Sequence, residues 1–534
     1  MLEVLREGYQ IPFLRVPPLS SVPISLTAYT PSSDKFRALQ SEVASMLEKQ
    51  AIEVVKEDFT GFYNRLFVVT KATGGWRPVL DVSVLNKFVV LTKFKMESPK
   101  SVLSAIMKND WMVSIDLKDA YFQVPVHPAS RKYLRFVFGG VVYQFRALCF
   151  GLSTAPQVFT RVFTQVGRWL RLSNVRVLMY LDDWLVLDQS REKLLRDVRL
   201  ILQFAQELGF LVNLQKSALV PSQSAVYLGM VIDTLRFWVS PRPKRVENFL
   251  SRLRELRACV RPPAILWQQV LGHMTSLEQF VPGAKLRMRR LQFHLRANWD
   301  MVSSPKSTLI AVPCGALEDL VWWSDPVRLS RGVPIWRDLL PLSLFSDAST
   351  QGWGATLGHL QVSGLWSREE SQLHINLLEL RAVRLALRHW QSQVSGRAVC
   401  VFGDNTTSLA YIRHQGGTRS WRLFLEAELL LLWAEGQSVV ISTCFIPGER
   451  NVLADSLSRQ GQVLPNEWIL HQDVCRRLWS LWGTPLLDVC ATRDTFRLPL
   501  YVSPVQDPQA WAIDVRLLTF DHLFVYAYPP LGLI

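Results

Sequence analysis

The sequence predicts a multidomain α+β protein. Its 534 residues are more than one hydrophobic core accommodates, so several domains are expected. Strand-forming runs, amphipathic helical runs and glycine-containing turns alternate through much of the chain, and this mixture is typical of α+β sheet domains. Hydrophobic residues make up 49% of the chain and charged residues 20%, which is the composition of a globular protein.

The chain is strongly basic. Lys and Arg number 60 against 45 Asp and Glu, which leaves a formal net charge of +15. A basic excess with 11% aromatic residues available for stacking favours a polyanionic partner, and nucleic acid is the leading candidate. A basic enzyme without such a partner would have the same composition, so charge alone leaves that alternative open.

The cysteines and the apolar runs indicate an intracellular protein. The seven cysteines are scattered singly, without a CxxC pair or a Cys/His cluster at zinc-ligand spacing, which predicts a reducing compartment and no structural zinc. No apolar run approaches the ~20 residues that span a bilayer, and the N-terminus does not resemble a signal peptide. We therefore expect a protein of the cytoplasm or nucleus that is neither secreted nor membrane-bound.

The N-terminal region is predicted to be an arm followed by a helix. Residues 1–35 are rich in Pro and Ser and predict an extended arm. Leu39, Val43 and Leu47 recur every fourth residue, which predicts one amphipathic helix over residues 35–52.

A β-hairpin is predicted next, around a glycine-containing turn. Residues 65–70 and 76–82 are its two strands. Lys71 and Arg77 flank the turn, where they could reach a triphosphate. Solubility explains two isolated surface cations equally well, so the pattern leaves both interpretations open.

Two adjacent carboxylates, Asp182 and Asp183, interrupt an apolar run over residues 175–187. The pattern predicts a tight hairpin that holds two negative charges at the edge of a buried sheet. Such burial is costly without a cation such as Mg²⁺, although an exposed Asp-Asp turn is the simpler alternative. The predicted strand 111–117 carries Asp116 near its end, so three aspartates could hold two cations if the strands are neighbours.

Further elements follow on both sides of this hairpin. Residues 133–138 and 141–145 predict a second hairpin around Gly139-Gly140. In the FGLSTAP run that follows, Gly151, Ser153 and Thr154 allow a ligand to approach the backbone closely, although a helix cap before Pro156 explains them almost as well.

The rest of the first half is predicted to be a capped helix, two strands and a basic helical region. The helix spans residues 190–209, and the short strands are placed at 213–216 and 227–232. Between residues 241 and 341 the pattern is helical, with Arg at helical spacing as on a surface that follows a phosphate backbone. A solvated helix face would give the same spacing.

A second acidic constellation is predicted after residue 341. Asp347 follows a strand, Asp404 follows another, and Asp455 begins a short helix. Glu379 lies on the apolar face of a helix predicted over residues 369–390, where an acid has to be neutralised, protonated or bound to a metal. Four acids at the ends or inner faces of elements predict a second two-metal site.

Together these residues resemble the reverse transcriptase and ribonuclease H of a retrotransposon. The motifs that carry the resemblance are, in chain order, Trp76-Arg77-Pro78 with Asp81 and Leu85-Asn86, Asp116 with Tyr121, FGLSTAP, Tyr180-Leu181-Asp182-Asp183, Lys216, Tyr227-Leu228-Gly229, and the four acids Asp347, Glu379, Asp404 and Asp455. The runs HINLLELRAV, DNTTSLAYIRHQGGTRS and IPGERNVLADSLSR are most similar to DIRS-type elements, which integrate with a tyrosine recombinase. The resemblance covers roughly residues 40–460.

The resemblance implies a right-hand polymerase with fingers, palm and helical thumb/connection, followed by an RNase H-like α/β domain. The implied boundaries are 1–40 for the arm, 41–238 for fingers and palm, 239–340 for the basic thumb/connection, 341–460 for the RNase H-like domain and 461–534 for a C-terminal segment. This last segment resembles one described as methyltransferase-like, but it lacks a Gly-rich cofactor loop, so a complete methyltransferase is not expected. The abrupt start and end predict a fragment of a longer element-encoded protein.

The implied activities are those of an RNA-directed DNA polymerase (a nucleotidyltransferase) and a ribonuclease H (an endonuclease). The implied partners are an RNA template, a DNA primer, dNTPs and an RNA/DNA hybrid. The implied cofactor is Mg²⁺, two ions per active site, with Mn²⁺ as the alternative. A decayed copy that binds nucleic acid without catalysis is the rival, and the presence of all seven acids argues against it.

The resemblance also implies residue roles. Metal-binding and catalytic roles fall to Asp116, Asp182, Asp183, Asp347, Glu379, Asp404 and Asp455, nucleotide binding to Lys71, Arg77, Tyr121, Gln157 and Lys216, and the primer grip to Tyr227, Leu228, Gly229 and Met230. Tyr121 would be the steric gate that excludes a 2′-hydroxyl. Many relatives have a His ten residues before the last acid, and Phe445 stands there in this chain, which puts that His's role in doubt.

Overall fold

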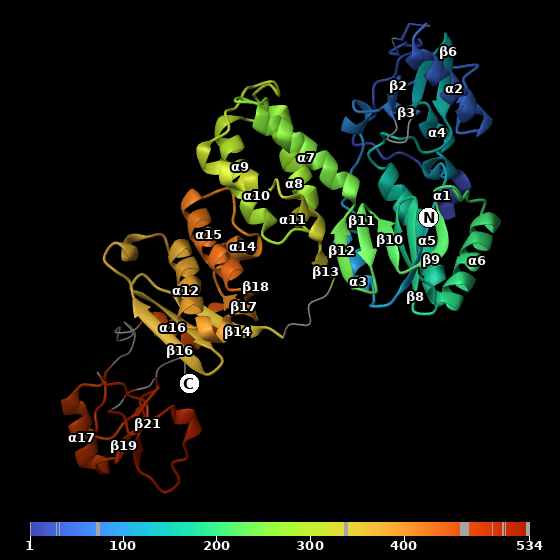
Figure 1. Cartoon of the computed structure of the whole chain (residues 1–534). Helices are drawn as coiled ribbons and strands as arrows, with labels where there is room; N and C mark the ends of the chain where they lie inside the picture. Colours follow the sequence, from blue (N-terminus) through green and yellow to red (C-terminus); the bar gives the residue numbers. More distant parts are fainter. Residues whose placement is uncertain are drawn as a thin grey trace. The chain divides into compact units, whose positions relative to one another are not determined.

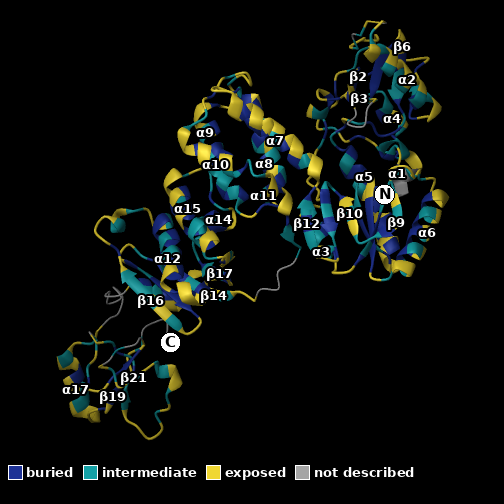
Figure 2. Ribbon diagram, in the orientation of Figure 1, coloured by how far each residue is buried: buried dark blue, intermediate teal, exposed yellow. Residues whose placement is uncertain are grey.

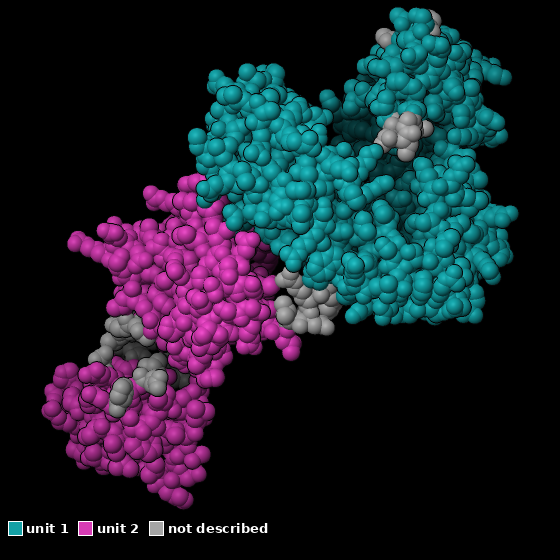
Figure 3. Space-filling model, in the orientation of Figure 1, with its two compact units in different colours: residues 1–338 teal, residues 339–534 magenta. Residues whose placement is uncertain are grey.

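The chain divides at residue 338 into two units, Met1–Asp338 and Leu339–Ile534 (Figures 1 and 3). The computed structural model describes all residues except 1, 28, 31, 71–74, 336–339, 460–468, 494, 505, 506, 508 and 530–534. Buried residues gather along the strands and on the inner faces of the helices (Figure 2). None of the described helices is both long and apolar enough to cross a lipid bilayer. All seven cysteines lie in the described part and are free thiols.

A four-stranded antiparallel sheet lies at the centre of the first unit, in the order β7-β8-β4-β9. Its strands are β4 (Trp111–Asp116), β7 (Arg176–Tyr180), β8 (Asp183–Asp188) and β9 (Ala218–Ser222). Successive side chains alternate between its faces, and both faces are buried. One face packs with helices α5 (Ala155–Leu172) and α6 (Arg191–Glu207), and the other with α3 (Pro99–Ala105) and a second sheet.

Two smaller sheets and helix α2 precede the central sheet in sequence. Strands β2 (Arg65–Thr70) and β3 (Trp76–Asp81) form the first predicted hairpin, and β5 (Arg135–Phe138) and β6 (Val141–Phe145) form the second, which β1 (Ile52–Val54) extends. The predicted helix over 35–52 is confirmed as α2 (Asp34–Glu48), with the Ser33 side chain capping its first turn. Short elements complete this region: η1 (Leu85–Lys87), η2 (Ala120–Gln123) and α4 (Pro128–Arg131).

The predicted extended arm is wrong at its start, where α1 (Leu2–Glu7) is helical. The following residues run along the unit as an irregular segment that is fixed by isolated bridges from Tyr9 to Val126 and from Phe13 to Val89. Ile11 is buried, and its backbone N–H donates to the Ser130 hydroxyl. Apolar residues among the prolines therefore attach this segment to the folded unit.

The predicted strand at 213–216 is wrong, and the one predicted at 227–232 is confirmed only in part, because a turn divides it. Residues 214–216 form a turn in which the Asn213 side chain accepts from the Lys216 N–H, and β9 starts only at Ala218. Residues 227–232 contain the turn of a hairpin, because Leu228 and Gly229 have positive φ angles of 46° and 74°. That hairpin belongs to a second antiparallel sheet with the strands β10 (Ser224–Tyr227), β11 (Met230–Asp233), β12 (Trp238–Pro241) and β13 (Val333–Pro334).

The predicted helical region follows this sheet and is confirmed. Its elements are α7 (Pro243–Ala258), α8 (Ala264–Leu277), α9 (Ala284–Asn298), η3 (Cys314–Ala316), α10 (Leu317–Trp322) and α11 (Pro326–Arg331). Phe249, Trp267 and Trp323 are fully enclosed between these helices. Arg252, Arg254 and Arg257 are exposed on α7, which leaves a basic surface in this part of the unit.

The second unit contains a five-stranded mixed sheet in the order β16-β15-β14-β17-β18. Its strands are β14 (Leu342–Ala348), β15 (Gly352–Leu357), β16 (Leu360–Leu365), β17 (Ala398–Gly403) and β18 (Val440–Phe445), and its helices are α12 (Ile375–His389), α13 (Gln391–Val394), α14 (Thr406–Arg413), α15 (Trp421–Gly436) and α16 (Val452–Ser458). Strand β17 runs parallel to both its neighbours, whereas β14, β15 and β16 are antiparallel. The predicted helix over 369–390 starts later than expected, because the His374 side chain caps α12 at Asn376.

The described part of residues 469–529 forms helix α17 (Gln472–Trp482) and four two-residue strands. They are β19 (Leu487–Asp488), β20 (Val502–Ser503), β21 (Ala512–Ile513) and β22 (Val525–Tyr526). β20 pairs parallel with β21, β19 pairs parallel with β22, and a bridge joins Asp488 to Tyr501. These strands form two small parallel sheets, β19-β22 and β20-β21, and the bridge is the contact between them.

Candidate metal centres

The register of the central sheet of unit 1 brings three aspartates to one end. Asp116, the last residue of β4, is the Cα partner of Asp183, the first residue of β8. Asp182 lies in the two-residue turn between β7 and β8, where Leu181 has a positive φ of 53°. The Leu117 N–H donates to the Asp182 carbonyl oxygen at 2.9 Å and fixes this turn against the end of β4.

The negative charges of the aspartates at this end of the sheet repel one another. Asp183 is accessible to solvent, but the surrounding protein removes part of its hydration, and this effect together with the charges of Asp182 and Asp116 raises its pKa to about 6. Desolvation raises the pKa of Asp116 too, and the Lys216 ammonium group opposes the rise. Nearby cationic side chains do not balance the negative charge of these carboxylates. Carboxylate oxygens are hard ligands, so the group fits Mg²⁺ or Mn²⁺.

Neighbouring segments hold the backbone of these aspartates in place. The Asp116 N–H donates to the Ser217 hydroxyl at 3.0 Å, and the Asp116 carbonyl accepts from the Asn213 N–H at 2.8 Å. On the other side, the Tyr227 hydroxyl donates to the Asp183 carbonyl at 3.0 Å. The sequence pattern gave no sign of these contacts, because they join segments that lie far apart in the chain.

Two of the four residues expected to grip a primer are part of the core. Tyr227 is 3% exposed and Met230 0% exposed, whereas Leu228 and Gly229 form the turn between them and are partly exposed. Gly229 lies against Arg245, because a Cβ on Gly229 would lie 2.3 Å from the Arg245 Nη2 atom. Of these four residues, Leu228 and Gly229 in the turn are the two that are exposed enough to contact a ligand.

An aromatic group lies beside the aspartates. The Arg77 guanidinium lies 5.3 Å from the Phe150 ring centre, Phe150 lies 4.9 Å from Tyr121, and Tyr121 lies 5.6 Å from Phe159. Burial, with a contribution from the Asp182 charge, raises the pKa of Tyr121 to about 12. Phe150 was not among the expected site residues, although its position just before Gly151 in the FGLSTAP run could have indicated it.

The other residues expected to bind the nucleotide lie in different surroundings. Gln157 is buried, and its side-chain amide donates to the Thr92 hydroxyl at 2.5 Å, so it fixes another segment of the protein. Lys216 is exposed and close enough to Asp116 and Asp183 to affect the pKa of each. Lys71 lies outside the described residues.

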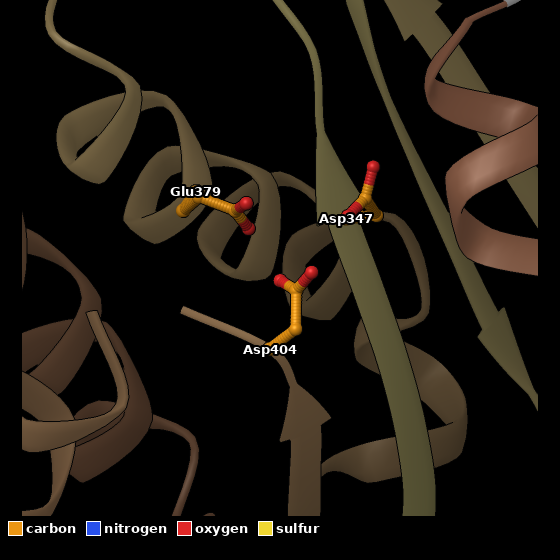
Figure 4. A group of neighbouring side chains, drawn as sticks. All are labelled: Asp347, Glu379 and Asp404. Atoms are coloured by element: carbon orange, nitrogen blue, oxygen red, sulfur yellow. The ribbon is translucent and has the colours of Figure 1, made fainter. Parts of the chain in front are cut away.

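The second unit brings Asp347, Glu379 and Asp404 together. One carboxylate oxygen from each lies within 4.8 Å of the others. Asp347 is on β14, Asp404 follows β17, and Figure 4 shows Glu379 projecting from α12 towards these two strands. The parallel register of β14 and β17 explains the meeting of the aspartates, because Phe345 pairs with Phe402 and each aspartate follows two residues later.

This cluster has a large electrostatic cost. Burial, with the charges of Asp347 and Asp404, raises the pKa of Glu379 to about 9. Burial also raises the pKa of Asp347, although a hydrogen bond from Ser458 opposes the rise. Asp404 is the least buried of the three. Three carboxylates at this spacing fit a divalent cation with oxygen ligands.

Asp455, the fourth expected acid, is not in this cluster. Its Oδ1 accepts from the Arg459 Nη2 at 2.6 Å and from Nε at 2.9 Å, so an arginine neutralises it. Its charge nevertheless contributes to raising the pKa values of Asp347 and Glu379, which places it near them. The structure therefore brings three of the four acids together and leaves the fourth beside them in an ion pair.

Comparison with known proteins identifies part of the chain. Residues 69–232 match the family described as reverse transcriptase (RNA-dependent DNA polymerase). The chain is 23% identical over 417 residues to the enzymatic polyprotein of Cestrum yellow leaf curling virus, and 22% identical over 480 residues to the transposon Tf2-3 polyprotein of Schizosaccharomyces pombe. The matches cover 72% and 86% of this chain but 60% and 32% of those proteins.

Two solved structures share the fold. The dRH form of foamy viral protease-reverse transcriptase in complex with double-stranded DNA aligns with a TM-score of 0.52 at 16% identity, over 82% of this chain and 75% of that one. The same viral protein in complex with an RNA/DNA hybrid aligns with a TM-score of 0.51 at 15% identity, over 86% and 60%. Residues 69–232 thus match the reverse transcriptase family, the chain is similar to viral and transposon polyproteins, and its fold is shared with the foamy viral structures.

Glu379 generates a prediction about pH. Burial raises the pKa of the Glu379 carboxyl to about 9 in the metal-free folded chain, whereas the ordinary pKa of a glutamate is 4.5. The unfolded chain therefore binds fewer protons between these values, and stability falls as the pH rises through this window. Glu379→Gln should match the wild type near pH 4.5 and exceed it by more than about 2 kcal/mol at pH 8.5, since each unit of pKa difference is worth about 1.4 kcal/mol. Unfolding in EDTA measures this.

The matched control is Glu449→Gln, which changes an exposed glutamate in the same unit. It should follow the wild-type pH profile throughout. A Glu379→Gln profile parallel to the wild type from pH 4.5 to 8.5 would contradict the assignment of a protonated, buried carboxyl.

Proposed function

We propose that the chain is an RNA-directed DNA polymerase with ribonuclease H activity, encoded by a DIRS-type retrotransposon. The observation that carries the proposal is the presence of two separate acidic clusters on one chain. Asp116, Asp182 and Asp183 lie within the residues that match the reverse transcriptase family, and Asp347, Glu379 and Asp404 lie in the second unit. The DIRS-type origin rests on the sequence of the HINLLELRAV, DNTTSLAYIRHQGGTRS and IPGERNVLADSLSR runs.

In the polymerase reaction, the aspartates of unit 1 would hold two Mg²⁺ ions, or Mn²⁺ ions, beside the primer end. When bound, such ions assist attack of the primer 3′-hydroxyl on the α-phosphate of a dNTP and stabilise the leaving phosphate. Asp116 and Asp182 would be the main ligands, and Asp183 would complete the set. Lys216, whose charge opposes the rise in the pKa of Asp116, would compensate part of the negative charge between turnovers.

The aromatic group would hold the incoming nucleotide. Tyr121 packs against Phe150 and Phe159, so its ring is held in one orientation and would exclude a 2′-hydroxyl as a steric gate. Arg77 is positioned over Phe150 and would bind the triphosphate. Gln157 would act indirectly, by holding Thr92.

The primer strand would pass the turn at Leu228 and Gly229. A cavity of about 300 Å³ opens there, lined by Leu228, Arg245, Thr275, Ser276 and Glu278 among others. Arg245 is partly buried, and its guanidinium is close enough to donate to the Ser276 carbonyl at 3.5 Å. The Arg245 guanidinium would suit a phosphate of the primer backbone, whereas the Thr275 and Ser276 hydroxyls donate to carbonyls of their own helix. Tyr227 would support this turn from inside and fix Asp183 at the same time.

In the hydrolytic reaction, Asp347, Glu379 and Asp404 would bind the cations, and Asp455 would join them when Arg459 releases it. The substrate would be the RNA strand of an RNA/DNA hybrid. The buried position of Glu379 favours a cation over a free carboxylate, because ionisation without one is costly there.

We also propose the domain organisation of the chain. Its parts would be an arm over 1–40, fingers and palm over 41–238, a basic thumb/connection over 239–340, an RNase H-like domain over 341–460 and a C-terminal segment, similar to a methyltransferase-like region, over 461–534.

Asp182→Asn tests the polymerase site. It should lower Mg²⁺-dependent extension of a DNA primer on an RNA template by about 100-fold or more, because a charge that binds metal in the transition state is lost. Binding of the primer–template, measured by fluorescence anisotropy, should change little. Asp233→Asn is the matched control, since the Asp233 carboxylate pairs with the Arg236 side chain and accepts from the Arg236 backbone N–H in the same unit. A wild-type chain that binds primer–template but does not extend it would contradict the polymerase proposal.

Asp404→Asn tests the second cluster. Cleavage of RNA in an RNA/DNA hybrid should fall by about 100-fold or more, while primer extension should stay at the wild-type rate, because the two clusters belong to different units. Asp473→Asn, which changes an exposed aspartate of the second unit, should leave both activities unchanged. Hybrid cleavage that survives Asp404→Asn would show that another site performs it.

A further inference from the structure

Two serine hydroxyls connect the end of strand β14 to the last turn of helix α16. The Ser458 Oγ atom donates to the Asp347 Oδ2 atom at 2.6 Å. In the opposite direction, the Ser349 Oγ atom donates to the Ser458 carbonyl oxygen at 2.7 Å. Ser458 is 0% exposed, so water does not compete for either contact. The Ser349 bond ends on a backbone carbonyl oxygen, whereas the Ser458 bond ends on a carboxylate of the acidic cluster.

The proton of Ser458 has two acceptors within reach. Its Oγ also lies 2.8 Å from the Asp455 carbonyl oxygen, one turn earlier in the helix. A hydroxyl donates one proton at a time, and a bond to an ionised carboxylate is roughly twice as strong as one between neutral groups. The bond to Asp347 is therefore the favoured one whenever that carboxylate is charged.

The position of α16 does not depend on Ser458. The Asn451 side chain, 2% exposed, donates to the Ser346 carbonyl at 3.0 Å and anchors the start of the helix. Gly354 allows β15 to approach the helix closely, since a Cβ there would lie 2.4 Å from the Leu457 Cβ and 2.6 Å from the Ala454 carbonyl. Removing the Ser458 hydroxyl should leave the helix in place and change mainly the Asp347 carboxylate.

We propose that Ser458 is a positioning residue that holds the Asp347 carboxylate in the orientation needed to bind a divalent cation together with Glu379 and Asp404. This inference rests on the proposed ribonuclease H function. Carboxylate oxygens of Asp347 and Asp404 lie within 4.8 Å of each other and repel, so an unrestrained Asp347 side chain would turn away from Asp404. A buried donor on one oxygen prevents this rotation, as hydrogen-bond partners behind metal ligands commonly do.

The test measures metal binding directly. Mn²⁺ is titrated into the full chain and free Mn²⁺ is followed by electron paramagnetic resonance, in an Asp116→Asn/Asp182→Asn background that removes the metal site proposed for unit 1. Ser458→Ala should weaken Mn²⁺ binding about 10-fold. Ser458→Cys should lie between Ala and the wild type, because a thiol is a weak donor. Asp404→Asn is the reference for the loss of a direct ligand.

Ser349→Ala separates positioning from anchoring of the helix. It removes the other bond between the same two segments, together with the bonds that the Ser349 Oγ atom accepts from the Gln351 and Gly352 N–H groups, but leaves the contact of Ser458 with Asp347. It should lower the melting temperature about as much as Ser458→Ala and leave Mn²⁺ affinity within about twofold of the reference background. The proposal would be overturned if Ser458→Ala bound Mn²⁺ as tightly as the unmodified Asp116→Asn/Asp182→Asn background. It would also be overturned if Ser458→Ala and Ser349→Ala weakened Mn²⁺ binding equally.

Cleavage of an RNA/DNA hybrid by the wild-type chain keeps the two proposals distinguishable. If the wild type binds Mn²⁺ in a Ser458-dependent manner but cleaves no hybrid, the ribonuclease H function fails and the positioning role stands. If the wild type cleaves hybrid and Ser458→Ala cleaves equally at every Mn²⁺ concentration, the positioning role fails and the function stands. Absence of Mn²⁺ binding at the acidic cluster overturns the positioning role.

Discussion

Backbone hydrogen bonding forces like charges together in both units, and the rest of each unit is built around this constraint. In unit 1 the antiparallel register of β4 and β8 pairs Asp116 with Asp183. In unit 2 the parallel register of β14 and β17 brings Asp347 level with Asp404. A sheet cannot relieve such repulsion without losing its register, and slippage by one residue would turn every buried side chain outward. A divalent cation removes the repulsion without moving the strands.

The two clusters differ in how the surrounding protein reduces the repulsion between the acids. Around Asp183, an exposed lysine, Lys216, supplies positive charge and solvent remains accessible. Around Glu379 the protein supplies burial, and the raised pKa shows that a proton takes the place of a cation when none is bound. Polar contacts from neighbouring segments, Tyr227 in unit 1 and Ser458 in unit 2, hold the acidic strand ends in position.

Local sequence patterns predicted the elements that carry the acids but not the contacts between distant segments. Alternating apolar residues and Gly-containing turns identified the hairpins and strands, because these signals are local. The burial of Tyr227, the bond from Gln157 to Thr92 and the bond from Ser458 to Asp347 depend on tertiary packing, which no periodicity reveals. The strand predicted over 227–232 is interrupted by a turn, because Leu228 adopts a positive φ that its side chain does not signal.

We propose that each of the two clusters binds divalent cations. Crystals of the full chain grown with Mn²⁺ and an RNA/DNA hybrid, measured at the manganese absorption edge, test it most directly. We expect anomalous density beside Asp116 and Asp182 and, separately, among Asp347, Glu379 and Asp404. Well-ordered carboxylates without anomalous density at saturating Mn²⁺ would contradict the account, and so would density at only one of the two clusters.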